Sequence, residues 1–169
     1  MKRINALVLC FLLFAMMFTG CKKTGDDQQE PSATVSMYDL SKAMEAAAGF
    51  SGMNYRSNSD DAPEDAFSYI SSMDYEKIAA FFVSYASNKE NPNADELCVI
   101  AVKDVSDVGE AEASLRRHQE KRVSQYASYA PKQVPKAEGG IVFSEGQYAV
   151  LIISDDNATV RQAFLDFVR

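Results

Sequence analysis

The chain has 169 residues, and its 24 acidic against 17 basic side chains give a formal net charge of −7. An acidic chain of this kind is a poor candidate for binding nucleic acid or for adhering to anionic lipid by charge. It contains no phosphate-binding glycine loop, no C-x-x-C pair and no H-E-x-x-H motif, so the enzyme classes that those motifs mark are not indicated.

The first twenty residues have the pattern of a bacterial export signal. Two basic residues open the chain, an apolar run follows over Ile4–Phe18, and the small pair Thr19-Gly20 precedes Cys21. A helix of about 15 residues rises only roughly 22 Å, less than the ~30 Å hydrocarbon core of a bilayer. Residues 1–20 are therefore predicted to be a removable signal peptide rather than a permanent membrane span.

The quartet Phe18-Thr19-Gly20-Cys21 resembles a bacterial lipobox, in which small residues precede a cysteine that takes diacylglycerol. The alternative is an ordinary secretory signal with an incidental cysteine, but the position and the small neighbours favour lipidation. Cys21 is then the acylated N-terminus, because stable anchoring needs more than one acyl chain and this modification supplies two or three. The prediction is a lipid-anchored protein on the extracytoplasmic face of a bacterial cell membrane.

Signal cleavage would remove Lys2 and Arg3 and leave 15 basic against 24 acidic residues, a net charge of −9. The lipid, and not charge, would then hold the protein at the membrane. Residues 21–35 hold few large apolar side chains and are predicted to be a flexible tether that reaches at most roughly 50 Å. Residues 36–169 suffice for a single globular domain, in which Cys98 is the only cysteine left besides Cys21, so no internal disulfide is expected.

Several elements can be predicted in chain order within this domain. A helix is expected from the cap Ser36 to Gly49, a short extended piece at 53–56, and a short helix or irregular segment at 64–72. The spacing of Ile78, Phe81, Phe82 and Tyr85 predicts an amphipathic helix over 74–88.

The second half of the domain begins with a short β-branched run at 96–103, which predicts a buried strand. A long helix is expected over 108–130, where Pro131 stops it. Strands at 137–144 and 147–154 form a hairpin across Glu145-Gly146, and a last helix is capped by a residue among 155–157. This order predicts an α+β fold: a two-layer sandwich whose mainly antiparallel sheet of about three to four strands is packed by amphipathic helices.

His118 is the only histidine, so any acid–base or metal proposal that needs a histidine must use it. A hydrolytic triad would pair it with a serine and a carboxylate, but no G-x-S-x-G motif is present. We expect a partly buried, hydrogen-bonded surface histidine. Cys98 stands among apolar neighbours, which indicates a buried structural thiol rather than a reactive one.

Two acidic segments, 58–65 and 91–95, invite a test for calcium. The second lacks the glycine and the final carboxylate of an EF-hand loop, at positions held by Glu96 and Val102. Both are expected to be solvated loops and caps, and no metal or cofactor is predicted.

Arg122 lies near the centre of the apolar stripe of the long helix, where an apolar residue would be expected. It either extends past Tyr126 to solvent or pairs with a carboxylate at an edge of the core. Because Arg and Tyr are favoured at interfaces, Arg122, His118, Tyr126 and Tyr129 form a candidate binding surface.

Three segments carry a family resemblance: DELCVIAVK at 95–103, RVSQYASYAP at 122–131 and GQYAVLIIS at 146–154. With YEKIAAFFV at 75–83, they resemble domain-of-unknown-function family 4358, found in lipid-anchored envelope proteins largely of Firmicutes. The resemblance implies a Gram-positive envelope lipoprotein, and it implies no catalytic residues.

Two classes of function are consistent with these observations. The first is a non-catalytic envelope module that binds a peptide, a glycan or another protein, with the membrane engaged through the N-terminal lipid. The second is a small cell-envelope hydrolase or modifying enzyme that uses His118 or a pair of carboxylates, since a glycosidase needs only two such groups.

Overall fold

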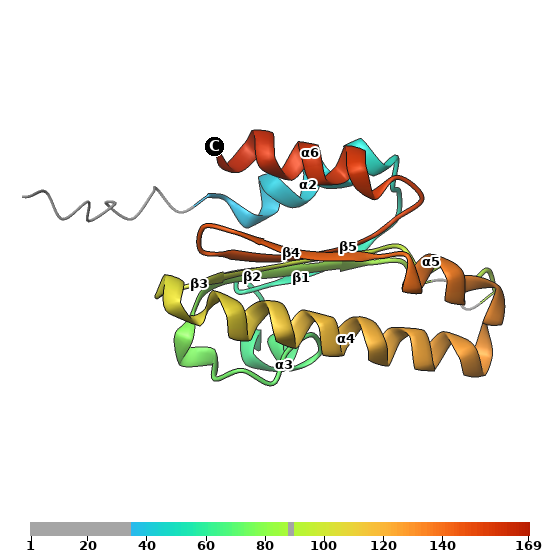
Figure 1. The fold of residues 1–169 in the computed structure, drawn as a ribbon, viewed down its shortest axis with the longest axis horizontal. Coiled ribbons are helices and arrows are strands. Elements are labelled where there is room, and N and C mark those ends of the chain that lie inside the picture. Colours follow the sequence, from blue (N-terminus) through green and yellow to red (C-terminus); the bar gives the residue numbers. More distant parts are fainter. Residues whose placement is uncertain (1–34, 88–89) are drawn as a thin grey trace, which may run out of the picture. The chain divides into compact units, whose positions relative to one another are not determined.

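An antiparallel sheet forms the centre of the computed structural model, which describes residues 35–87 and 90–169 (Figure 1). The predicted signal peptide, Cys21 and nearly all of the predicted tether lie outside the described residues. Within the described part, the sheet has five strands in the order β1-β2-β3-β5-β4. The strands are β1 (Asn54–Ser57), β2 (Ile78–Tyr85), β3 (Glu96–Val102), β4 (Ile141–Glu145) and β5 (Tyr148–Ile153). Each neighbouring pair is antiparallel.

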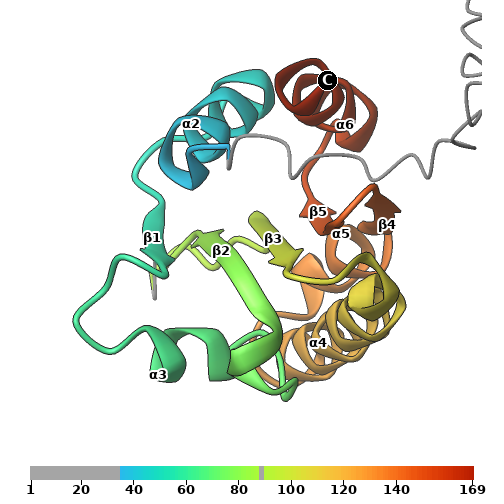
Figure 2. The same ribbon diagram turned by 90° about the vertical axis from the view of Figure 1, so that its left-hand side faces the viewer.

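Helices cover both faces of this sheet (Figures 1 and 2). On one face lie α2 (Met37–Ala48) and α6 (Asn157–Val168), and on the other lie α3 (Pro63–Ser68) and the long α4 (Val108–Tyr129), against which α5 (Val134–Glu138) packs. Short 3-10 turns complete the order: η1 (Tyr75–Lys77), η2 (Val105–Asp107) and η3 (Pro131–Gln133). The predicted α+β class is confirmed. The described residues form five strands rather than three to four, and three layers rather than the expected two.

The central strands explain the third layer. Successive side chains of a strand point to opposite faces. In β3, Leu97 and Val99 therefore pack in the core beneath α2 and α6, whereas Cys98 and Ile100 pack in the core beneath α4. All seven residues of β3 and all six of β5 are buried. Strands this apolar need a cover on each face, which only helices on both sides supply.

Strand β2 corrects the predicted helix over 74–88. The spacing of Ile78, Phe81, Phe82 and Tyr85 fits a helical stripe, but the same residues belong to a continuous apolar run. A run buried on both faces loses the alternation that marks a strand, so periodicity does not separate the two states. In the structure Phe81 faces α3, where it packs on Phe67, and Phe82 faces α2; neither side chain is exposed.

The ends of other elements follow local chemistry. Ser36 caps α2 by accepting a hydrogen bond from the backbone N–H of Asp39, and the predicted hairpin between β4 and β5 turns at Gly146, whose φ is +54°. Strand β4 begins at Ile141 rather than at the predicted residue 137, because α5 occupies the first part of that segment. Across residues 35–87 and 90–169, no helix has the length and apolar character needed to cross a membrane.

The outer strand β4 receives a side chain along its free edge. Arg116 of α4 donates a hydrogen bond to the backbone carbonyl of Val142 at 3.1 Å. The same guanidinium forms an ion pair with Glu112, one helical turn earlier, at 2.6 Å. Arg116 is thus held in place over a backbone group of β4.

Candidate functional site

A buried charged cluster joins the start of β3 to the inner face of α4. The Glu96 carboxylate has no exposed surface and contacts an imidazole and a guanidinium: its Oε1 lies 2.5 Å from Nε2 of His118, and its Oε2 lies 2.7 Å from Nε of Arg122. The Arg122 contact is an ion pair rather than an aligned hydrogen bond. We call Glu96, His118 and Arg122 the Glu-His-Arg cluster.

Two simple periodicities bring these residues together. Glu96 and Cys98 are two residues apart on β3, so both point toward α4. His118, Arg122 and Tyr126 recur every four residues on α4, which places them on one helical face directed at the sheet. An isolated buried carboxylate would be very costly, and the paired guanidinium offsets that cost.

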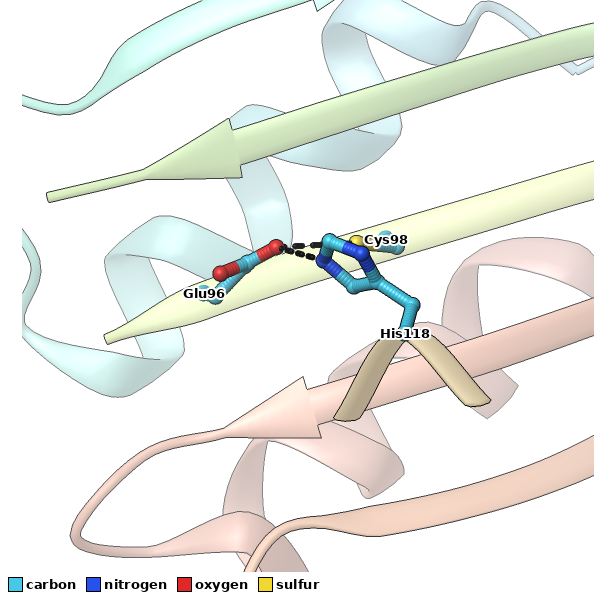
Figure 3. Close-up of side chains that lie close together, drawn as sticks. All are labelled: Glu96, Cys98 and His118. Atoms are coloured by element: carbon cyan, nitrogen blue, oxygen red, sulfur yellow. Dashed lines mark hydrogen bonds and ion pairs between the residues drawn. The ribbon is translucent and has the colours of Figure 1, made fainter. Parts of the chain in front are cut away.

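The thiol of Cys98 lies next to the same carboxylate, with its Sγ 3.6 Å from Glu96 Oε1 (Figure 3). Burial raises the pKa of the Cys98 thiol well above its ordinary value, and the negative charge of Glu96 raises that pKa further. In a catalytic triad the imidazole lies between nucleophile and carboxylate. Here Glu96 contacts both the thiol and His118, and all three are buried, so the arrangement is not that of a cysteine hydrolase.

Tyrosines surround the guanidinium of Arg122. Its Nη2 donates to the hydroxyl of Tyr126 at 2.7 Å, and that hydroxyl donates to the backbone carbonyl of Asn93 at 2.9 Å. Burial is the largest influence and lowers the pKa of Arg122, but Glu96 and the nearby tyrosines together outweigh it, so the pKa lies above its ordinary value. The ring of Tyr69 packs edge-on against His118, with 5.2 Å between ring centroids. Arg122 is therefore a fixed cation.

The structure places the four residues of the predicted binding surface at different depths. His118 is buried, deeper than the partly buried surface position expected for it, and Arg122 and Tyr126 are buried as well. Arg122 adopts the second of its two predicted alternatives, pairing with a carboxylate. Tyr129 alone of the four is well exposed, with 58% of its surface accessible. Of these four side chains, only that of Tyr129 is exposed enough for a partner to contact it directly.

Sequence reasoning missed Glu96 as a site residue, because the strand predicted at 96–103 gives it only a structural role. A signal was present, because a carboxylate at the head of an apolar strand requires a cationic partner inside the protein. Arg122 is that partner, and His118, one turn earlier on the same helix, is a hydrogen-bond partner of the same carboxylate. Helical spacing gave their shared face but did not indicate which strand would lie opposite.

One aspartate in each of the two acidic segments tested for calcium is held by contacts within the protein. The Asp60 carboxylate accepts from the backbone N–H of Ser57 and pairs with Arg56. Asp95 pairs with Lys136 at 2.9 Å and accepts from the side chain of Asn93. These contacts fit the caps and loops expected from the sequence.

Two further surface features lie near α3 and α4. A hollow of about 430 Å³ beside α3 is lined by Phe67 and Tyr75 together with the acids Glu64, Asp74 and Glu76, and its lining contains no basic side chain. Elsewhere, the half-buried rings of Tyr69 and Tyr85 pack against each other in a tilted arrangement, with 5.5 Å between centroids, and Tyr69 and Tyr129 both lie near the guanidinium of Arg122. We call Tyr69, Tyr85 and Tyr129 the tyrosine patch.

A family model described as "Domain of unknown function (DUF4358)" matches residues 51–154. The chain belongs to the DUF4358 family. The match confirms the resemblance drawn from the segments at 95–103, 122–131 and 146–154. It extends from just before β1 to just after β5, so all members of the Glu-His-Arg cluster lie inside the family region. No curated protein and no solved structure gives a significant match.

Proposed function

We propose that this DUF4358 protein is a lipid-anchored, non-catalytic binding module of a bacterial cell envelope. One observation supports the binding role. Glu96, His118 and Cys98 are buried in the core, where the carboxylate contacts both the imidazole and the thiol, whereas the nearby Tyr129 is exposed. A catalytic group must reach a substrate in a cleft. Tyrosine, by contrast, is enriched where proteins bind their partners.

The location follows from the sequence pattern of residues 1–21. The short apolar run, the small pair before Cys21 and the polar segment after it support an acylated N-terminus that holds the domain outside the membrane. The acidic net charge gives no electrostatic attraction to anionic lipid, so attachment to the membrane would depend on the acyl chains. Residues 22–35 would then serve as the spacer between lipid and domain.

Replacement of Cys21 by Ala tests the anchor. The variant should no longer incorporate radiolabelled palmitate and should lose the membrane retention of the processed chain, because only the acyl chains supply the affinity. Cys10→Ser is the matched control, since this cysteine lies inside the predicted signal and should be dispensable. Full membrane retention of a processed Cys21→Ala chain would contradict the proposal.

The binding role is tested on the tyrosine patch. We expect the purified chain to bind isolated cell walls or a peptide or glycan derived from them, and Tyr129→Ala to weaken this binding about tenfold or more, as loss of an aromatic hot spot does. Tyr38, 56% exposed on α2, provides the control: Tyr38→Ala removes an equally exposed ring from another part of the domain. Equal binding by the two variants would show that the tyrosine patch is not the binding surface. Turnover of any envelope substrate would contradict the non-catalytic role and indicate an enzyme.

A further inference from the structure

Three metal-binding side chains meet beneath α4. One ligand atom from each of Glu96, Cys98 and His118 lies within 4.8 Å of the other two, and all three residues are buried. Figure 3 shows the carboxylate and the imidazole extending toward each other beside the sulfur, from two residues of β3 and one of α4. A carboxylate, a thiol and an imidazole are the three side-chain types that bind zinc in proteins.

We propose that Glu96, Cys98 and His118 bind a zinc ion. The donor set selects this class of metal, because thiolate sulfur is soft and imidazole nitrogen suits zinc, whereas calcium and magnesium prefer oxygen alone. Three protein ligands leave one position of a tetrahedral ion for water. The site is independent of the binding role proposed above.

The spacing of the ligand atoms is close to what a tetrahedral zinc ion requires. Zinc bonds of about 2.0–2.3 Å separate neighbouring ligand atoms by roughly 3.3–3.6 Å. The Cys98 sulfur and Glu96 Oε1 are already 3.6 Å apart. The imidazole of His118, at 2.5 Å from the same oxygen, would move away by less than about 1 Å.

Charge and proton balance are consistent with a divalent ion. On binding, the S–H bond of Cys98 breaks, its proton leaves to solvent, and a thiolate–zinc bond forms. The thiolate and the Glu96 carboxylate bring two negative charges to the ion, and Arg122 stays paired with the other carboxylate oxygen. Nε2 of His118 gives up its hydrogen bond to Glu96, and its proton passes to Nδ1 or to solvent, so that the imidazole binds zinc through Nε2 in its neutral form. No oxidant or reductant is needed.

Arg122 has the position of an outer partner to the carboxylate ligand. It contacts Oε2 of Glu96 and leaves Oε1 to face the thiol and the imidazole. Groups that hold a ligand in this way commonly accompany metal sites and orient the ligand. The positive charge of Arg122 is also supported by contacts to Gln125 at 3.0 Å and to the hydroxyl of Tyr126. The pair with Glu96 need not break when the ion binds.

The ion can enter from the side of Tyr69. This ring packs on His118 and is itself half-buried, so the cluster lies one side chain below the surface. A rotation of Tyr69 would open His118 to solvent. Side-chain motion of this size requires no unfolding.

The test uses the full chain with Cys10 and Cys21 changed to Ser, so that Cys98 is the only thiol. After chelator treatment under a non-chelating reductant, Zn²⁺ is titrated in competition with a chromophoric chelator, and Co²⁺ is added separately as a spectroscopic probe. We expect one ion per chain, a thiolate-to-Co²⁺ charge-transfer band, and a melting temperature that rises with Zn²⁺. Cys98→Ser should abolish the band, and both Cys98→Ser and His118→Gln should weaken zinc binding about a hundredfold or more.

Glu45→Gln is the matched control, since Glu45 is a buried carboxylate on the opposite face of the sheet, hydrogen-bonded to Ser84. It should bind zinc like the parent chain. Absence of saturable binding, or binding that Cys98→Ser leaves unchanged, would overturn the proposal and leave the cluster as a hydrogen-bonded part of the core. If a variant does not fold, the Co²⁺ spectrum of the folded parent decides: no thiolate band means no site.

Discussion

Glu96→Gln should lower the free energy of unfolding by about 3–5 kcal/mol, because it leaves the buried guanidinium of Arg122 without its counter-charge. The glutamine amide keeps the size of the carboxylate and part of its hydrogen bonding, so the loss reports charge rather than volume. Urea unfolding of the purified chain in a chelating buffer measures the difference. The chelator separates this effect from the binding of a metal ion.

A double change distinguishes pairing from burial. The double variant Glu96→Leu, Arg122→Met removes both charges and puts an apolar side chain in place of each. Such replacements of a buried ion pair are often neutral or stabilising by 1–4 kcal/mol, so the double variant should be more stable than Glu96→Gln. A double variant as unstable as the sum of its single changes would show that the two side chains act independently.

The second large effect is expected on strand β2, where neighbouring phenylalanines point to opposite cores. Phe81→Ala and Phe82→Ala should each cost about 3–5 kcal/mol, since each ring is fully buried and each truncation leaves a cavity. Phe81 packs on Phe67 with 5.2 Å between ring centroids, and Phe82 stacks on Tyr55 at 6.0 Å. Chemical denaturation of both variants checks the prediction.

Phe167→Ala is the control for these two changes, because this ring, on α6, is 38% exposed and should cost clearly less. The pair of results also tests the three-layer arrangement. If only Phe81→Ala were strongly destabilising, the face of the sheet beneath α2 and α6 would be less well packed than the structure shows.

Much of the fold could be predicted from local signals. Ser36 and Gly146 mark a helix start and a hairpin turn, and the structure uses both in that way. The cap of the last helix was predicted among residues 155–157, and it is Asp156. What could not be predicted was the layer count and the state of β2. Both depend on the first and last helices of the described residues, α2 and α6, packing on the same face of the sheet, which is a long-range contact that no local pattern encodes.

The candidate site could be predicted only in part, because it too depends on a long-range contact. Helical spacing placed His118, Arg122 and Tyr126 on one face, and a carboxylate partner was one of the two alternatives predicted for Arg122. The choice of Glu96 among the 24 acidic residues depends on β3 lying opposite the second half of α4, which only the tertiary fold determines. Burial of His118 follows from that same contact.

The hydrogen bond from Arg116 to the edge of β4 affects whether neighbouring molecules at high concentration can pair their sheets. An outer strand with free backbone groups can template the addition of a strand from another molecule. The guanidinium already occupies the carbonyl of Val142, and its long charged side chain stands where an incoming strand would have to lie. If the proposed lipid anchor concentrates the protein on a membrane surface, this contact would keep neighbouring copies from joining their sheets along β4.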